Sequence, residues 1–260
     1  MVEVQDFREM GEALGNACAV LRSNAASAGL DAEVPNCPGW RVRDLVTHMG
    51  VVHRWSAAFV TKSKPRPEKV VEAEAAASAD LLDWFDDGMV ELLNAFASAP
   101  EDLDIRFFLH DAPPPRDAWL RRMVHETTIH AADTIAARLG RSVTAAELWV
   151  PAWLAADGVD ELLTGAVPRR TDPPALAVGE HVLVHATDAA RAWLLTGGDE
   201  RTSATRVEEV KAPLIAANVD QVIEGSAAAV YLALWNRGSS VGADDAWWRG
   251  WRERVTIVWS

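Results

Sequence analysis

Cysteines and long apolar runs are both scarce in this sequence. Its 260 residues include two cysteines, Cys18 and Cys37, which are far apart and in no metal-type spacing. Cys18 lies on an apolar helical stripe and Cys37 in a turn, so both are interpreted as structural. We expect no disulfide framework, and the composition suits a reducing compartment. No apolar stretch is long enough to span a bilayer, and the first residues lack the pattern of a signal peptide. We therefore expect a cytoplasmic protein with no membrane partner.

Basic charge is also in short supply. The chain carries 25 lysines and arginines against 38 aspartates and glutamates, which gives a net charge of −13. Nucleic-acid binding depends on lysine and arginine to neutralise phosphates, so we expect no nucleic-acid partner. A small-molecule substrate, anionic or electrophilic, is still compatible with a few local arginines. The oligomeric state stays open.

Apolar residues, in contrast, make up 49% of the chain, which is enough to form a core. Their spacing in the first half is helical, and helices of this number and size typically form a bundle. The predicted helices span residues 5–26, 42–61, 69–97, 116–139 and 145–163.

A linker is predicted at residues 167–174, which read V-P-R-R-T-D-P-P, because the character of the chain changes there. Beyond it, the pattern predicts short strands at 175–177, 181–186 and 192–195, a helix at 223–236 and a closing strand at 254–260. These elements indicate a small α+β domain with a mostly antiparallel sheet. We therefore expect a helical bundle over residues 1–166, followed by an α+β domain over residues 174–260.

Chemically active side chains gather at residues 123–133, which read M-V-H-E-T-T-I-H-A-A-D. In a helix, Glu126 and His130 lie one turn apart on a mostly apolar side, whereas His125 points about 100° away. Buried charge is unfavourable unless it is paired or bound to a metal. This stripe therefore requires a partner.

A third ligand is expected from another helix, because a catalytic zinc site usually has three protein ligands and an open position. The best candidate is His48, which shares an arc of its predicted helix with apolar residues, while His53 falls on the opposite margin. The alternative is that His48 and His130 are core histidines with ordinary hydrogen bonds. Arg121 and Arg122 are left outside the predicted site, since at least one of them is expected on the solvated face.

Three segments together resemble a known family. They read C-P-G-W-R-V-R-D-L-V-T-H-M-G-V-V-H-R-W at 37–55, H-E-T-T-I-H-A-A-D at 125–133 and G-S-A-A-A-V-Y-L-A-L-W-N-R at 225–237. They are similar to the mycothiol-dependent maleylpyruvate isomerase family of actinobacteria. That family combines a DinB-like, metal-binding four-helix bundle with a sterol-carrier-like α+β domain, and the resemblance covers nearly the whole chain.

The resemblance implies a metal site and a thiol cosubstrate. His48, Glu126 and His130 would bind a divalent metal, most often zinc, and mycothiol would be the thiol. Arg237 would reach an anionic substrate or the thiol cofactor. The family often has arginine, and sometimes tryptophan, directly after its last metal histidine, where this chain has Ala131. A nearby basic or aromatic group is therefore expected to be missing, which bears on the substrate more than on the metal.

The expected chemistry starts from a metal-bound thiol, which ionises readily to the reactive thiolate. In an isomerase, the thiolate adds to an activated double bond, the resulting single bond rotates, and elimination gives the trans product. In an S-transferase, it attacks an electrophile and stays attached. Asp133, close to one turn beyond His130, is expected to orient that ligand or relay a proton; its alternative is a polar residue at a helix end.

Two further hypotheses stay open. One is a metal- or ligand-binding regulatory or accessory protein with no catalysis of its own, which a closed, fully protein-ligated metal would favour. The other is a helical bundle that uses these histidines only for packing.

Overall fold

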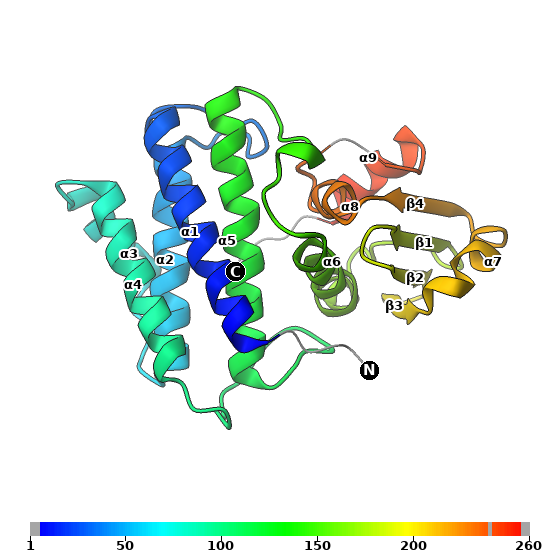
Figure 1. Cartoon of the computed structure of the whole chain (residues 1–260), viewed down its shortest axis with the longest axis horizontal. Helices are drawn as coiled ribbons and strands as arrows, with labels where there is room; N and C mark the ends of the chain where they lie inside the picture. Colours follow the sequence, from blue (N-terminus) through cyan, green and yellow to red (C-terminus); the bar gives the residue numbers. More distant parts are fainter. Residues whose placement is uncertain (1–5, 239–240, 256–260) are drawn as a thin grey trace. The chain divides into compact units, whose positions relative to one another are not determined.

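The structure is a computed structural model that describes residues 6–238 and 241–255. The chain divides into two compact units, one formed by residues 1–107 and 113–143 and the other by residues 108–112 and 144–260. The first unit is helical, and the second combines helices with a sheet (Figure 1). The expected fold class, a helical bundle followed by a small α+β domain, is confirmed.

Long helices that run side by side form the first unit (Figure 1). They are α1 (Phe7–Ala28), α2 (Val42–Val60), α4 (Leu81–Ser98) and α5 (Pro115–Leu139), with the shorter α3 (Glu68–Ala77) before α4. Helix α1 packs along α5, and α2 packs against α4 and α5. The order of these contacts places α2 and α5, which carry the candidate ligands, next to each other.

Helix α5 is buried along most of its length. Every residue from Ala118 to Ala137 is buried, including the charged ones. The helix begins at a proline, which suits a first helical position, and ends at Gly140, whose φ of 67° is the left-handed conformation that glycine adopts without strain. The polar residues within 123–133 therefore lie in the interior, where each requires a partner.

The single helix predicted at 69–97 is in fact two. Helix α3 ends at Ala77, where the Ser78 hydroxyl donates to the carbonyl of Ala75 at 2.8 Å. Helix α4 then begins after Asp80, whose carboxylate accepts hydrogen bonds from the backbone N–H groups of Leu82 and Asp83. Serine and aspartate compete with the helical backbone in this way, and the periodicity of the apolar residues does not register the break.

A sheet with strand order β3-β2-β1-β4 forms the core of the described part of the second unit. The strands are β1 (His181–Ala186), β2 (Arg191–Gly197), β3 (Thr202–Val207) and β4 (Gln221–Gly225). Strand β2 pairs antiparallel with β1 and β3, and β4 is parallel to β1, so the sheet is mostly antiparallel as expected.

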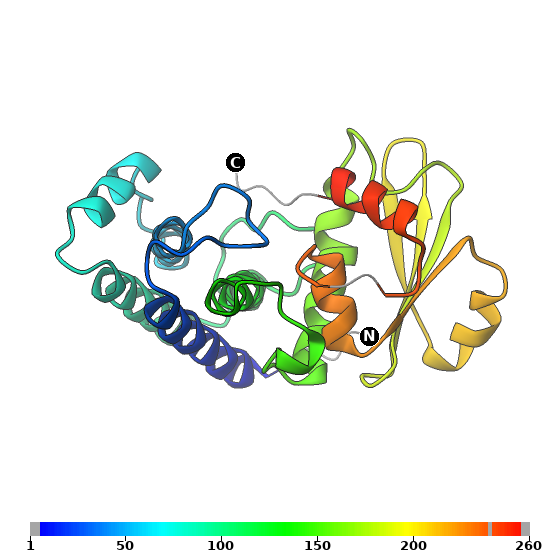
Figure 2. The same cartoon turned by 90° about the horizontal axis from the view of Figure 1, so that it is seen from above.

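Helices cover both faces of this sheet, as Figure 2 shows in a view from above. Helix α7 (Ala212–Ala216) packs on one face around Leu183, and α8 (Ala227–Leu234) packs on β1 and β4 from the other. Helix α6 (Ala152–Asp160) packs on α8, and α9 (Asp245–Arg254) closes the described chain. Short 3-10 turns lie at Ala145–Glu147, Val167–Arg169 and Glu209–Lys211.

The segment 144–166 differs from its prediction. It was expected in the helical bundle, as part of a domain ending at residue 166, but it belongs to the second compact unit. Asp160, fully buried at the end of α6, accepts hydrogen bonds from Trp193 Nε1 on β2 at 2.8 Å and from Arg206 Nη2 on β3 at 2.6 Å. These bonds tie α6 to the sheet, and helical periodicity alone cannot show which core a helix joins.

Other element boundaries also differ from their predictions. The helix predicted at 223–236 begins only after Ser226, whose hydroxyl accepts from the backbone N–H of Ala229, and β4 occupies the residues before it. Residues 175–177 form no strand, while β3 and α9 were not predicted. The strand predicted at 254–260 lies mostly outside the described residues; Arg254 belongs to α9. Within the described part of the chain, no helix combines the length and apolarity that crossing a bilayer requires.

Candidate metal centre

The structure brings His48 of α2 together with Glu126 and His130 of α5. Glu126 Oε1 lies 3.6 Å from His48 Nε2 and 3.5 Å from His130 Nε2. A tetrahedral ion with bonds of about 2.0–2.1 Å to nitrogen and oxygen holds its ligand atoms roughly 3.3 Å apart. Both distances from Glu126 Oε1 are therefore close to what such an ion requires, and the ligand atoms of all three residues lie within 4.8 Å of one another. Two imidazoles with one carboxylate are zinc-type donors.

Arg122, one turn before Glu126 on α5, holds the other oxygen of its carboxylate. Arg122 Nη2 donates to Glu126 Oε2 at 3.0 Å, and both side chains are only 3% exposed. Arg121 is buried as well, so the expectation that one of these arginines faces solvent was wrong. With Oε2 engaged, Oε1 is the atom turned toward the two imidazoles.

The environment of Glu126 keeps its carboxylate ionised. Burial alone would raise the pKa of this group, but the imidazoles of His130 and His48 and the charge of Arg122 hold the pKa well below its ordinary value. An ionised carboxylate among imidazoles is the form that binds a cation.

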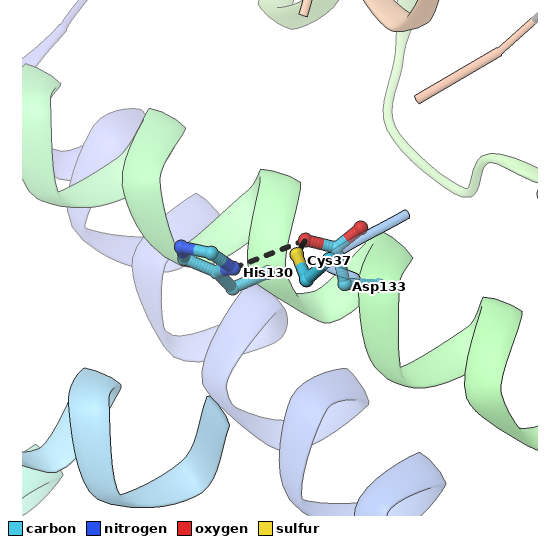
Figure 3. A group of neighbouring side chains, drawn as sticks. All are labelled: Cys37, His130 and Asp133. Atoms are coloured by element: carbon cyan, nitrogen blue, oxygen red, sulfur yellow. Dashed lines mark hydrogen bonds and ion pairs between the residues drawn. The ribbon is translucent and has the colours of Figure 1, made fainter. Parts of the chain in front are cut away.

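Asp133 lies against the other ring nitrogen of His130, as Figure 3 shows. His130 Nδ1 is 3.1 Å from Asp133 Oδ2, and the Asp133 side chain has no exposed surface. A histidine that donates its Nδ1–H to a carboxylate keeps its Nε2 lone pair for a metal. This geometry fits the orienting role expected for Asp133 and does not fit a solvated helix-end residue.

The loop between α1 and α2 also contacts Asp133. Asn36 Nδ2 donates to Asp133 Oδ1 at 3.2 Å, and the Cys37 thiol donates to Asp133 Oδ2 at 3.4 Å. The Ser142 hydroxyl holds Asn36 in turn, at 2.6 Å. The sequence placed Cys37 in a structural turn, but its neighbours Asp133 and His130 are distant in sequence and could not be identified from it.

Trp40, at the end of the same loop, supplies an aromatic ring beside the candidate ligands. Its ring centroid is 5.2 Å from that of His48, edge to face, and 6.2 Å from that of His130, nearly parallel. Because Ala131 follows His130, a nearby basic or aromatic group was expected to be missing. That expectation was wrong, since Trp40 and Arg122 provide both kinds of group from other positions.

His53 and Cys18 of the helical unit lie outside this group of side chains. His53 is fully buried and bonds through Nε2 to the Thr127 hydroxyl at 3.0 Å; burial, and then the charge of Arg54, lower its pKa to about 3. Cys18 is buried too, and burial, with a further contribution from Asp86, raises its pKa to about 12. Both are therefore neutral core residues at physiological pH.

Arg237 belongs to the second unit and lies in the turn that follows α8. Its Nη1 donates to the carbonyl oxygen of Trp235 at 2.9 Å, and its backbone N–H donates to the carbonyl oxygen of Leu232 at 2.8 Å. The role expected for Arg237 in binding an anion stays a prediction.

Comparisons with known proteins match both halves of the chain. The profile of the mycothiol maleylpyruvate isomerase N-terminal domain matches residues 9–135, and that of the MDMPI C-terminal domain matches residues 154–254. No curated protein sequence matches the chain.

Two solved structures share the fold. The crystal structure of the mycothiol-dependent maleylpyruvate isomerase superposes with a TM-score of 0.62 at 14% identity, covering 95% of this chain and 96% of that one. A histidine-to-alanine mutant of the mycothiol-dependent maleylpyruvate isomerase gives a TM-score of 0.63 at the same identity and coverage. At this identity the superposition establishes the fold alone.

Proposed function

We propose that this chain, which belongs to the mycothiol-dependent maleylpyruvate isomerase family, is a metal-dependent enzyme that uses a thiol cosubstrate to isomerise a small cis-enoyl acid. His48, Glu126 and His130 would hold a divalent metal, most simply zinc, and mycothiol would be the thiol. The observation that carries the proposal is that Glu126 Oε1 lies 3.6 Å from His48 Nε2 and 3.5 Å from His130 Nε2, with the ligand atoms of all three residues within 4.8 Å of one another.

When bound, the metal would lower the pKa of a coordinated thiol so that it reacts as the thiolate. The chain's own residues prepare the site for it. Arg122 donates to Glu126 Oε2 and so leaves Oε1 directed at the two imidazoles. Asp133 fixes the His130 ring so that Nε2 faces Glu126, and the ring of Trp40 packs beside both imidazoles. Three protein ligands leave a position for the thiol.

The isomerisation needs no oxidant or reductant. The thiolate adds to one carbon of the conjugated cis double bond, and the electron pair moves onto the adjoining carbonyl. The carbon–carbon bond, now single, rotates. The electron pair returns, the trans double bond forms, and the thiolate leaves unchanged. In S-transfer, the same thiolate would displace a leaving group and remain in the product.

The first test is metal content per chain, measured by elemental mass spectrometry after zinc reconstitution and desalting. The wild type is compared with His48→Ala, Glu126→Gln and His130→Ala, and with His110→Ala as a control at an exposed histidine outside the site. About one zinc per chain in the wild type and in the control, and a lower zinc content in the other three variants, is expected. Retention of zinc in all of them would overturn the proposed ligand set.

The second test is the reaction itself. The metal-loaded protein is incubated with mycothiol and maleylpyruvate, and the products are separated by chromatography. Formation of the trans isomer, with mycothiol recovered unchanged, is expected only with metal bound. A stable thioether would instead identify an S-transferase, and full activity in Glu126→Gln would contradict metal dependence.

A further inference from the structure

We propose that Cys37, His130 and Asp133 form a second metal position, distinct from the His48/Glu126/His130 set and selective for thiophilic divalent ions such as Cd²⁺, Co²⁺ and Zn²⁺. Its donors would be the Cys37 sulfur, His130 Nδ1 and Asp133 Oδ2. Figure 3 shows these three side chains turned toward one another. Neither the family resemblance nor the sequence spacing assigns a ligand role to Cys37.

Two of the three distances between the donor atoms are close to those around a tetrahedral ion. With metal bonds of about 2.3 Å to sulfur and about 2.0 Å to nitrogen and oxygen, the edges of the tetrahedron are roughly 3.5 Å for S···O and 3.3 Å for N···O. The structure has 3.4 Å from Cys37 Sγ to Asp133 Oδ2 and 3.1 Å from His130 Nδ1 to the same oxygen. All three ligand atoms lie within 4.8 Å of one another. An ion can therefore replace the hydrogen bonds with little rearrangement.

The surroundings hold one carboxylate oxygen ready for this purpose. Asn36 occupies Asp133 Oδ1 and is itself held by Ser142. Oδ2 is consequently the oxygen that both Cys37 and His130 approach. Asp133 is fully buried, whereas Cys37 is half-buried in a loop, so the cysteine is the donor nearer to solvent.

The donor set also fits the charge and softness of the ion. A carboxylate and a thiolate together balance a divalent cation, and thiolate donors favour soft ions such as zinc over magnesium or calcium. Binding releases one proton to solvent, from the Cys37 thiol, while the His130 ring stays neutral by carrying its proton on Nε2 instead of Nδ1. It forms one metal–sulfur, one metal–nitrogen and one metal–oxygen bond. No oxidant or reductant is required.

Sharing His130 couples the two metal positions. A neutral imidazole has one free lone pair, so an ion at Nδ1 competes for the ring with an ion at Nε2. This coupling, unlike the second position itself, rests on the proposed function. The His48/Glu126/His130 set is the first position. Excess thiophilic metal is therefore expected to inhibit the enzyme, because an ion bound to His130 and Asp133 at the second position removes His130 as a ligand of the first.

The test is a Co²⁺ titration of the full chain in buffer without free thiols, monitored by sulfur-to-cobalt charge-transfer absorption in the near ultraviolet. The wild type is compared with Cys37→Ser, which keeps a hydrogen-bond donor to Asp133, and with Cys18→Ser as the matched control. We expect the absorption in the wild type and in Cys18→Ser, and its loss in Cys37→Ser. No such absorption in the wild type, or equal absorption in Cys37→Ser, would overturn the proposal.

A His48→Ala variant separates this inference from the proposed function. Removing His48 disables the His48/Glu126/His130 position only and ends its competition for His130, so the absorption is expected at lower Co²⁺ concentration than in the wild type. If His48→Ala binds cobalt as the wild type does, the first ligand set is wrong, and the Cys37→Ser comparison still decides the second. Loss of the absorption in His48→Ala would show that the cysteine does not belong to a separate position.

Discussion

Arg122 Nη2 donates to Glu126 Oε2 at 3.0 Å across one turn of α5, and neither side chain is more than 3% exposed. Removing one member of a buried ion pair leaves an uncompensated charge, which typically lowers stability by about 3–5 kcal/mol. The pair is therefore both a structural contact of the interior and the element that presents Glu126 Oε1 to the two histidines.

The first prediction concerns this pair. In the metal-free protein, Arg122→Met is expected to lower the free energy of unfolding by about 3 kcal/mol, and by clearly less in a Glu126→Gln background, because the carboxylate is then already neutral. Urea unfolding of the four proteins of the cycle measures the difference. Equal losses in the two backgrounds would show that the two side chains do not interact.

The second prediction concerns Asp133. Asp133→Asn is expected to lower zinc affinity by about 10–100-fold, since the His130 ring loses the carboxylate that fixes its tautomer and orientation. Competition with a chromophoric chelator measures the affinity. Asp117→Asn, on the same helix but bonded to Arg116 outside the site, is the control, and a similar loss in both variants would refute a specific role for Asp133.

The third prediction concerns the pH dependence of stability. His53 has a folded-state pKa of about 3, below an unfolded value of about 6.5. Between these values the unfolded chain binds the proton and the folded chain does not, so the stabilisation is fully present above pH 6.5 and falls as the pH is lowered. From pH 7 to pH 5 the loss attributable to His53 is about 2 kcal/mol. Urea unfolding at both pH values should show this loss in the wild type and not in His53→Gln; parallel pH profiles would contradict it.

The fourth prediction concerns Trp40. The centroid of its ring lies 5.2 Å from that of His48 and 6.2 Å from that of His130. Co²⁺ bound to His48, Glu126 and His130 is therefore expected to quench Trp40 fluorescence strongly. Trp40→Phe keeps an apolar aromatic ring at the site and should lose most of the Co²⁺-dependent quenching while still binding the metal. Trp84→Phe, in which the replaced ring contacts Arg54 instead, is the comparison; equal quenching in Trp40→Phe and the wild type would place the ion elsewhere.

The fifth prediction concerns the second unit. Asp160→Asn is expected to lower the free energy of unfolding by about 2–3 kcal/mol, because the fully buried carboxylate loses charge-assisted hydrogen bonds from Arg206. Asp111→Asn removes the exposed partner of the same arginine and should change stability by less than about 1 kcal/mol. Urea unfolding of both variants compares the two losses of stability. A larger loss in Asp111→Asn than in Asp160→Asn would contradict the prediction.

The sequence was sufficient for the parts of the site that depend on local geometry. Glu126 and His130 come together because four residues make about one helical turn, and His48 follows from an apolar arc on a neighbouring helix. Arg122 stands at the same spacing before Glu126 and could have been included by the same rule. It was left out because long basic side chains are usually solvated.

Contacts made by loops and between distant elements were not accessible in this way. Trp40 and Cys37 reach α5 through a turn whose path depends on how α1 and α2 pack. The same limit applies to the fold: α6 has an ordinary helical pattern, and its packing on α8 and the bonds that Asp160 accepts from β2 and β3 assign it to the second unit. The polar strand β3 and the short strand β4 gave too weak an alternation to be identified.

The burial of α5 also has a consequence for motion. Backbone amides in a helix with no solvated face exchange with deuterium only when much of the surrounding structure opens, so we expect slow exchange at Glu126 and His130. Residues 35–40, which are all half-buried or exposed, can open at much lower free energy. Opening of residues 35–40, which include Cys37 and Trp40, would then set the rate of ligand entry and release. Helix α5, which carries Glu126 and His130, would stay folded meanwhile.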